Sequence, residues 1–176
     1  MGPKFKFNKL DERTRVLMCE EIDVAEKTNN IYSSTRFNDI GRENWVVLLK
    51  KAAQEHDEHW LAYQLELIDA MKELEIKSTP KGDYTIAYVL HSSTETLADG
   101  QFNRFYMAAI CRRALEESKT HVTVYRAKQR SNPRSKSREL EGTSLDANDL
   151  LNELRVTNLS FNCNVAQPNS GFSIDY

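Results

Sequence analysis

The chain has 176 residues, of which 40% are hydrophobic and 28% charged, and this size and composition predict one globular domain over residues 1–176 with a core of its own. Its 24 Lys and Arg against 26 Asp and Glu give a formal net charge of −2, which argues against a general nucleic-acid coat, and no apolar run approaches the roughly 20 residues of a membrane span. The three cysteines form no C-x-x-C pair, so we expect reduced packing thiols and no disulfide scaffold.

The first ten residues predict an extended arm ahead of a globular core over residues 11–155. Residues 4–9, Lys-Phe-Lys-Phe-Asn-Lys, begin with alternating basic and aromatic side chains, and a period of two is typical of extended chain. Phe5 and Phe7 would therefore share one surface of the arm, with the lysines on the other. The N-terminus holds no hydrophobic stretch that resembles a signal peptide, so we expect a protein of the cytoplasm or of a particle assembled there.

Three helices are expected in the first part of the core. Asp11 can cap a helix that runs to about Lys27, and residues 42–55 place apolar side chains at the spacing of an amphipathic helix. A third helix, over about residues 57–74, carries an apolar stripe wide enough to be covered on two sides. The core residues expected from these helices and from a later aromatic helix are Trp45, Trp60, Leu61, Ile68, Phe105, Tyr106 and Ile110.

Residues 78–82, Ser-Thr-Pro-Lys-Gly, form the clearest break in the chain, since proline disfavours helix before it and glycine permits a turn. The segment over residues 83–97 that follows is open to two interpretations. Apolar residues alternate from 84 to 88 as in a strand, but the apolar residues of the whole segment also fit a helix. We favour the helix, because Asp83 can act as its N-cap and Gly100 stands where such a helix would end, before the aromatic helix begins.

The last part of the chain mixes strand and helix signals. His121–Tyr125 alternates with β-branched residues and predicts a short strand, and Ser144 or Asp146 can cap a short helix. Residues 156–176 carry a single charged side chain and are expected to form an extended C-terminal segment. We therefore expect a mainly helical α+β fold with a small sheet from residues 121–127 and 156–161.

Two clusters carry metal-ligand side chains, and we assign a metal to neither. His56 and His59 share a helix face, but the zinc-peptidase motif is H-E-x-x-H, so these weak candidates compete with the simpler interpretation of a solvated acidic helix start. Glu75-Ile76-Lys77 has the E-x-K form of metal-dependent nucleases, which belongs on a strand, whereas here the residues are expected to end a helix. No nucleotide-binding loop or serine-hydrolase motif occurs, and we expect no catalytic residues and no cofactor.

The charge pattern is a more specific signal than any catalytic motif. Residues 126–138 hold six basic side chains and no acid: Arg126, Lys128, Arg130, Arg134, Lys136 and Arg138. Arginine and the serine hydroxyls between these residues suit the oxygens of phosphate. Acidic residues follow this loop immediately, and residues 55–75 contain seven more. The loop could therefore equally dock on an acidic face of this chain or of a neighbouring copy. The sequence leaves both interpretations open.

Both ends of the chain are too short to form a core, but each could add a strand or an apolar anchor to another surface. That surface could belong to this domain or to a neighbouring subunit. The side chains expected to make these arm contacts are Phe5, Phe7, Phe161, Phe172 and Tyr176.

Several segments resemble small uncharacterised proteins encoded in the genomes of tailed bacteriophages. They are Leu97–Ala114, Val124–Lys128, Asn132–Arg134 and Leu150–Arg155, together with Ser34–Phe37 before Gly41. The resemblance spans about residues 33–155, and its motifs have no chemical role, so no catalytic residue comes with it. It implies a virion-associated protein, because phage genomes are rich in assembly components.

Taken together, these features favour a non-enzymatic structural or interaction protein, a phage virion assembly component. It would bind other protein subunits, as a homo-oligomer or in a larger assembly, through its arms and the loop over residues 126–138. The alternative is a small regulatory or defence-related protein that binds nucleic acid or a nucleotide through the same loop.

Overall fold

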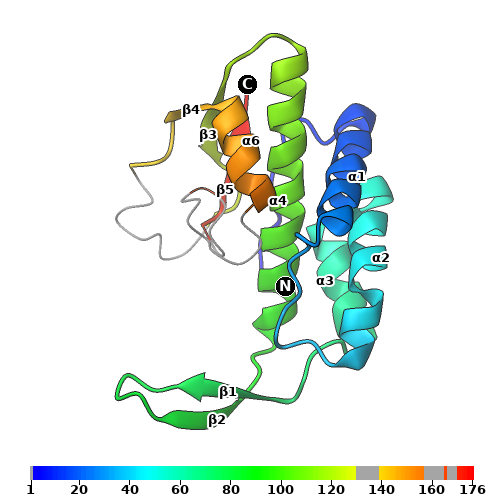
Figure 1. Ribbon diagram of the computed structural model, residues 1–176, viewed down its shortest axis with the longest axis vertical. Coiled ribbons are helices and arrows are strands. Elements are labelled where there is room, and N and C mark those ends of the chain that lie inside the picture. Colours follow the sequence, from blue (N-terminus) through cyan, green and yellow to red (C-terminus); the bar gives the residue numbers. More distant parts are fainter. Residues whose placement is uncertain (1, 130–138, 157–164, 166–169) are drawn as a thin grey trace.

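A computed structural model describes residues 2–129, 139–156, 165 and 170–176 of the chain. Within these residues, five helices and two small antiparallel sheets confirm the expected mainly helical α+β fold. A long helix, α4 (Ser92–Glu116), runs through the middle of the molecule, with the helices α1 to α3 on one side and a sheet with helix α6 on the other (Figure 1).

The helix α4 is the centre of the hydrophobic core. Phe102, Tyr106 and Ile110 have almost no exposed surface, and buried side chains occur on every face of its middle turns. The expected helix end at Gly100 is wrong, because α4 passes through this glycine without a break. A helical glycine costs only about 1 kcal/mol relative to alanine, and the burial of the flanking turns outweighs that preference.

The first three helices form where the sequence predicts them, with differences in where two of them begin or end. α1 (Glu12–Lys27) begins after Asp11, whose side chain accepts the N–H of Thr14, as predicted. α2 (Asp39–Glu55) begins earlier than expected, after the capping residue Asn38. α3 (Glu58–Leu67), capped by Asp57, is much shorter than the predicted helix over 57–74. It ends where Asp69 takes a positive φ of 50°, which a helix cannot continue through.

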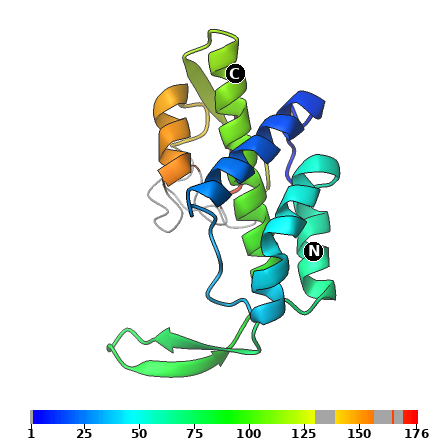
Figure 2. The same ribbon diagram turned by 45° about the vertical axis from the view of Figure 1, so that its right-hand side comes forward.

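The segment after α3 forms a β-hairpin, and the helix favoured over residues 83–97 is wrong in its first half. Strand β1 (Leu74–Ser78) pairs antiparallel with strand β2 (Tyr84–Tyr88), and Gly82 takes a φ of +86° in the connection. The pairing of Ile76 with Ile86 explains why this segment forms a strand and not a helix, because each apolar side chain gains a partner directly opposite it on the other strand. The hairpin projects beyond the helices at the end of the molecule where α4 begins (Figure 2).

A second sheet covers the other side of α4. Its central strand β3 (His121–Arg126) was predicted, and it pairs with β4 (Ser144–Asp146) and with β5 (Phe172–Asp175). β5 was not predicted as a strand, and the expected strand over 156–161 falls almost wholly on residues 157–164, which lie outside the described residues. The Asp146 side chain accepts the N–H groups of two residues in the first turn of α6 (Ala147–Val156), as expected for its cap.

Five of the seven predicted core residues are buried: Trp45, Leu61, Phe105, Tyr106 and Ile110. Trp60 and Ile68 are only partly buried and pack against the edge of the core. Ile68 is the capping residue at the end of α3, whereas the predicted helix continued to residue 74.

Candidate interaction surface

Two basic residues of the segment 126–138, Arg126 and Lys128, bind acidic residues of their own chain. The Arg126 Nε atom lies 3.1 Å from Glu141 Oε2, and its guanidinium stacks 4.4 Å from the ring centre of Phe172. Lys128 is fully buried, with its Nζ atom 2.6 Å from Asp99 Oδ2 and 3.1 Å from Glu95 Oε1. These two basic residues therefore support the fold. Arg130, Arg134, Lys136 and Arg138 lie outside the described residues.

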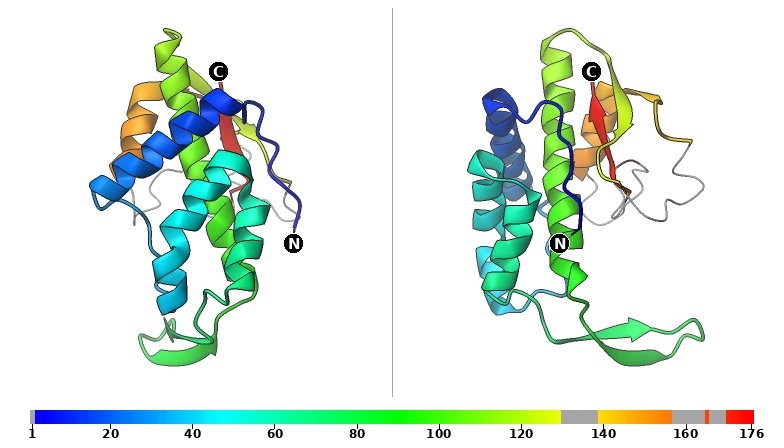
Figure 3. Two further views of the ribbon diagram at one scale, coloured as in Figure 1. Left: turned by 90° about the vertical axis from the view of Figure 1, so that its right-hand side faces the viewer. Right: turned by 180° about the vertical axis from the view of Figure 1, so that it is seen from behind.

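The N-terminal arm runs along α4 and contacts its own domain (Figure 3, right). The Phe7 ring lies 5.4 Å from Phe102 and 4.5 Å from Tyr106, centre to centre, and Phe5 stacks on Phe7 at 5.2 Å. The backbone of Lys6 is held on both sides: its N–H donates to the Ala127 carbonyl and its carbonyl accepts from the Tyr125 hydroxyl.

The arm also covers a buried carboxylate at the start of α3. The Phe5 N–H donates to Glu58 Oε1 at 2.9 Å, and Lys4 Nζ lies 2.6 Å from Asp57 Oδ2. Burial raises the pKa of Glu58 to about 6, although the Phe5 N–H opposes that rise. The arm is thus held by charged and apolar contacts together.

The C-terminal residues are equally engaged within the chain. Phe172 is fully buried in β5, and the Tyr176 hydroxyl donates to Glu117 Oε1 at 2.7 Å. Lys9 Nζ lies 3.4 Å from the centre of the Tyr176 ring and donates to the Tyr176 carbonyl. Of the five expected arm contacts, Phe161 lies outside the described residues, and the other four contact this domain.

The two clusters weighed as metal sites lie in different surroundings. His56 stacks on Trp60, with ring centres 4.1 Å apart, and the His59 Nε2 atom is buried without a hydrogen-bond partner among the described residues. The E-x-K residues do lie on a strand, β1, contrary to expectation, but the Glu75 carboxylate lies 2.6 Å from Arg36 Nε and 3.0 Å from Lys77 Nζ. These two cations lower the pKa of Glu75, Arg36 most strongly. Among the described residues, no three acidic, histidine or cysteine side chains form a group that could hold a metal ion.

The strongest candidate for an interaction site is the hairpin, which has an apolar face that the described chain leaves largely exposed. Its side chains come from both strands at alternate positions and are 45% to 79% exposed: Leu74, Ile76, Tyr84, Ile86 and Tyr88. The register places Leu74 opposite Tyr88 and Ile76 opposite Ile86, so all five share one face of the two-stranded sheet. We call this set the hairpin face.

Contacts with the helical part of the fold come from the polar face of the strands, whereas the side chains of the hairpin face remain largely exposed. Glu75, on the polar face, bonds to Arg36, and the Arg36 side chain also donates to the Ser93 hydroxyl in the first turn of α4. Amphipathic strands normally bury their apolar face, so this arrangement is the reverse of the usual one. Figure 3 shows how far the hairpin stands off from the rest of the fold.

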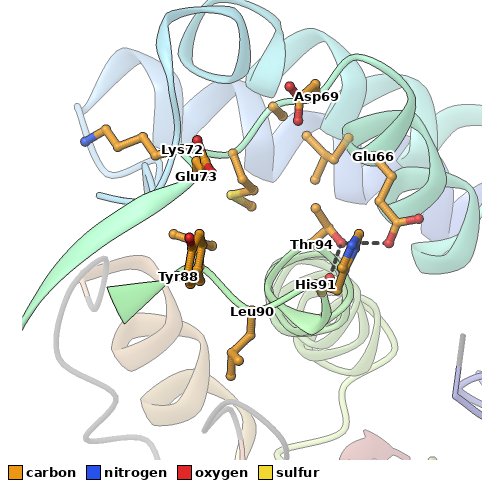
Figure 4. Close-up of a pocket in the computed structure, with 12 residues that line it drawn as sticks. Glu66, Asp69, Lys72, Glu73, Tyr88, Leu90, His91 and Thr94 are labelled. Carbon is orange, nitrogen blue, oxygen red and sulfur yellow. Dashed lines mark hydrogen bonds between the residues drawn. The ribbon is translucent and has the colours of Figure 1, made fainter. Parts of the chain in front are cut away.

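A hollow of about 550 Å³ lies at the base of the hairpin, between the end of α3 and the start of α4 (Figure 4). Tyr88 and Leu90 line it on the hairpin side. On the helix side, the Thr94 hydroxyl lies 2.9 Å from Glu66 Oε1 and 3.2 Å from the His91 carbonyl oxygen. These polar groups bind one another, and we assign no reaction to the hollow.

The alternation over residues 84–88, which forms half of the hairpin face, is visible in the sequence, but we favoured a helix there. The missed signal was the match between two short alternating segments, 74–78 and 84–88, on either side of a Pro-Lys-Gly turn. Two such segments predict a hairpin even though each one alone also fits a helix.

Comparisons of this chain with protein-family models, with curated proteins and with solved structures found no match. None of the helices in the described part of the chain combines the length and the apolar character that crossing a membrane requires.

Proposed function

We propose that this protein is a non-enzymatic assembly subunit that binds a neighbouring protein subunit through the hairpin face. The observation that carries the proposal is the exposed apolar face of the hairpin, whose five large side chains share one face of the strands and take no part in the hydrophobic core of the described chain. Contiguous exposed apolar patches of this kind are rare on monomeric proteins and mark interaction sites.

The energetics of the hairpin support the same conclusion. A two-stranded hairpin alone in water is marginally stable at best, because it has no second layer on which to bury its apolar side chains. Here β1 and β2 pair only with each other. A partner seated on the hairpin face would supply that second layer, and each apolar Å² it removed from water would contribute about 25 cal/mol.

We place the contact with the neighbouring subunit on the hairpin, whereas the sequence suggested the chain ends and residues 126–138. The described arm residues and Arg126 and Lys128 are engaged within the domain, whereas the hairpin face has no such partner among the described residues. The resemblance of residues 33–155 to tailed-phage proteins makes a virion the assembly that we propose first. Nucleic-acid binding by residues 126–138 gains no support from the two described basic residues, since both bind carboxylates of this chain.

The test is to recover the particle that contains this chain from the cells that produce it and to measure its composition by native mass spectrometry. Ile86→Glu places a charge in the middle of the hairpin face, while Thr85→Glu places the same charge on the opposite face of the same strand. We expect the wild type and Thr85→Glu in the particle and Ile86→Glu as a free 20.3 kDa chain. Equal incorporation of all three would overturn the proposal.

A further inference from the structure

We infer that the neighbour seated on the hairpin face is a second copy of this chain, with two hairpins packed face to face about a two-fold axis. This inference rests on the proposed function and adds the identity of the partner. Its basis is the charge, the shape and the size of the hairpin face.

The hairpin face carries no ionisable side chain that is charged at neutral pH. The charged residues of the two strands, Glu75 and Lys77, lie on the opposite face and pair with each other. A patch without charge offers nothing for an oppositely charged partner to recognise, and it can meet an identical patch without repulsion. Closed homodimers use the same patch on both copies, so self-complementarity is what such an interface requires.

The register of the strands provides a complementary shape. Ile76 and Ile86 form the central pair, with the bulky pair Leu74 and Tyr88 toward the base and the small Ser78 opposite Tyr84 toward the tip. A two-fold axis that runs across the strands at the central pair places the tip of one hairpin over the base of the other. The small Ser78 then faces Leu74 of the second copy, Tyr84 faces Tyr88, and each Ile86 faces its counterpart.

The size of the hairpin face is adequate for a stable dimer. Five side chains, two of them tyrosines, with 45% to 79% of each exposed, present on the order of 700 Å² per copy. Specific protein interfaces bury about 800 Å² per partner. The hairpin face would therefore supply a large part of a standard interface, with the sheets about 10 Å apart as in stacked sheets.

The experiment is sedimentation velocity on the purified full chain over a range of concentrations. We expect a mass that rises from 20.3 kDa toward twice that value as concentration increases. Ile86→Glu and Ile86→Lys should each weaken dimerisation at least tenfold, and Thr85→Glu should leave it unchanged. Because Ile86 is 70% exposed, circular dichroism should show the wild-type fold in each variant.

Mixing the two charged variants tests the two-fold geometry. A Glu at position 86 facing a Lys at position 86 across the axis should restore the dimer in an equimolar mixture, at concentrations where each variant alone is mainly monomeric. Failure of the mixture to dimerise would overturn the face-to-face arrangement.

Two further results would overturn the second copy as partner. A dimer that Ile86→Glu leaves intact would show that another surface joins the copies. A wild-type chain that stays monomeric at every concentration, but enters its particle in a manner that depends on Ile86, would show a different protein on the hairpin face. In that last case the proposed function stands and only the identity of the partner changes.

Discussion

Glu58 shows how one buried residue makes the stability of this domain depend on pH. Its side chain is 1% exposed in the first turn of α3, beneath the N-terminal arm, and burial raises its pKa to about 6 from an ordinary 4.5. Above pH 6 the group is charged in both the folded and the unfolded chain, and the folded chain holds that charge away from water. The contribution of Glu58 to stability therefore falls as pH rises from 4.5 to 6 and stays low above 6.

Replacing Glu58 by glutamine should remove this penalty, because the amide oxygen can still accept the Phe5 N–H. The raised pKa corresponds to about 2 kcal/mol, so we expect Glu58→Gln to increase the free energy of unfolding by up to that amount at pH 7.5. The gain should vanish near pH 4, where Glu58 is neutral in both states. Urea denaturation at the two pH values measures both quantities.

Asp57→Asn is the matched control, one residue away. Burial by itself raises the pKa of Asp57, but the hydrogen bonds from Lys4 and from the Trp60 N–H outweigh burial and lower it. The charged form of Asp57 thus stabilises the fold, and Asp57→Asn should reduce stability at pH 7.5 while keeping a side chain that caps α3. A loss of stability in Glu58→Gln at pH 7.5 would contradict the account of Glu58.

At the scale of the element, the hairpin is distinct from the rest of the fold. Its strands form a sheet of their own, and its link to the helices among the described side chains includes the Arg36 bond to Glu75. An element with so few ties to the core among the described residues adds little to the stability of the domain.

Replacing residues 75–87 by a short Gly-Ser linker should therefore leave the isolated domain folded. We expect the thermal midpoint of the monomer to change by only a few degrees, since an ion pair at the surface contributes little to the stability of a fold. Circular dichroism and light scattering on the same sample measure the fold and the loss of assembly. Unfolding of the shortened chain would show that the hairpin belongs to the core.

The elements also show which parts of the fold were predictable. The caps at Asp11 and Asp146 act within a few residues of the chain, and both were predicted from local sequence. The hairpin was missed because its apolar residues fit two periods, and pairing with residues 74–78 decides between them. Strand β5 was missed because its partner β3 lies more than forty residues earlier in the chain, and only tertiary contact joins them. The hairpin face is the main part of the candidate site, and it could not be predicted without the pairing of residues 74–78 with residues 84–88.

Over the whole molecule, the two ends of the chain meet on the same side of α4. Asn8 Nδ2 donates to Asp175 Oδ2 at 2.9 Å, and Lys9 Nζ lies 3.0 Å from Asp175 Oδ1. The arm also bonds to β3 through Tyr125, the strand that pairs with β5. The sequence showed that both ends carried aromatic anchors, but which surface they would reach depended on the whole fold. The structure places the described anchors on this domain.

This arrangement predicts that the arm contributes to the stability of the single chain. Phe7 packs against Phe102 and Tyr106 at the centre of α4, so Phe7→Ala opens a gap over the core. We expect a loss of about 2 kcal/mol, below the roughly 3–5 kcal/mol for a fully buried phenylalanine, because Phe7 is half-buried. Urea denaturation under conditions where the chain is monomeric measures this loss.

Lys6→Ala is the control for the arm, because the ties of Lys6 to Ala127 and Tyr125 run through its backbone and survive the change. Its exposed side chain should contribute almost nothing to the free energy of unfolding. If Phe7→Ala left the monomer as stable as the wild type and weakened only the assembly, the arm would act between subunits and the contact with α4 would be secondary. If it destabilised the monomer as expected, the arm would be a part of the domain that its fold requires.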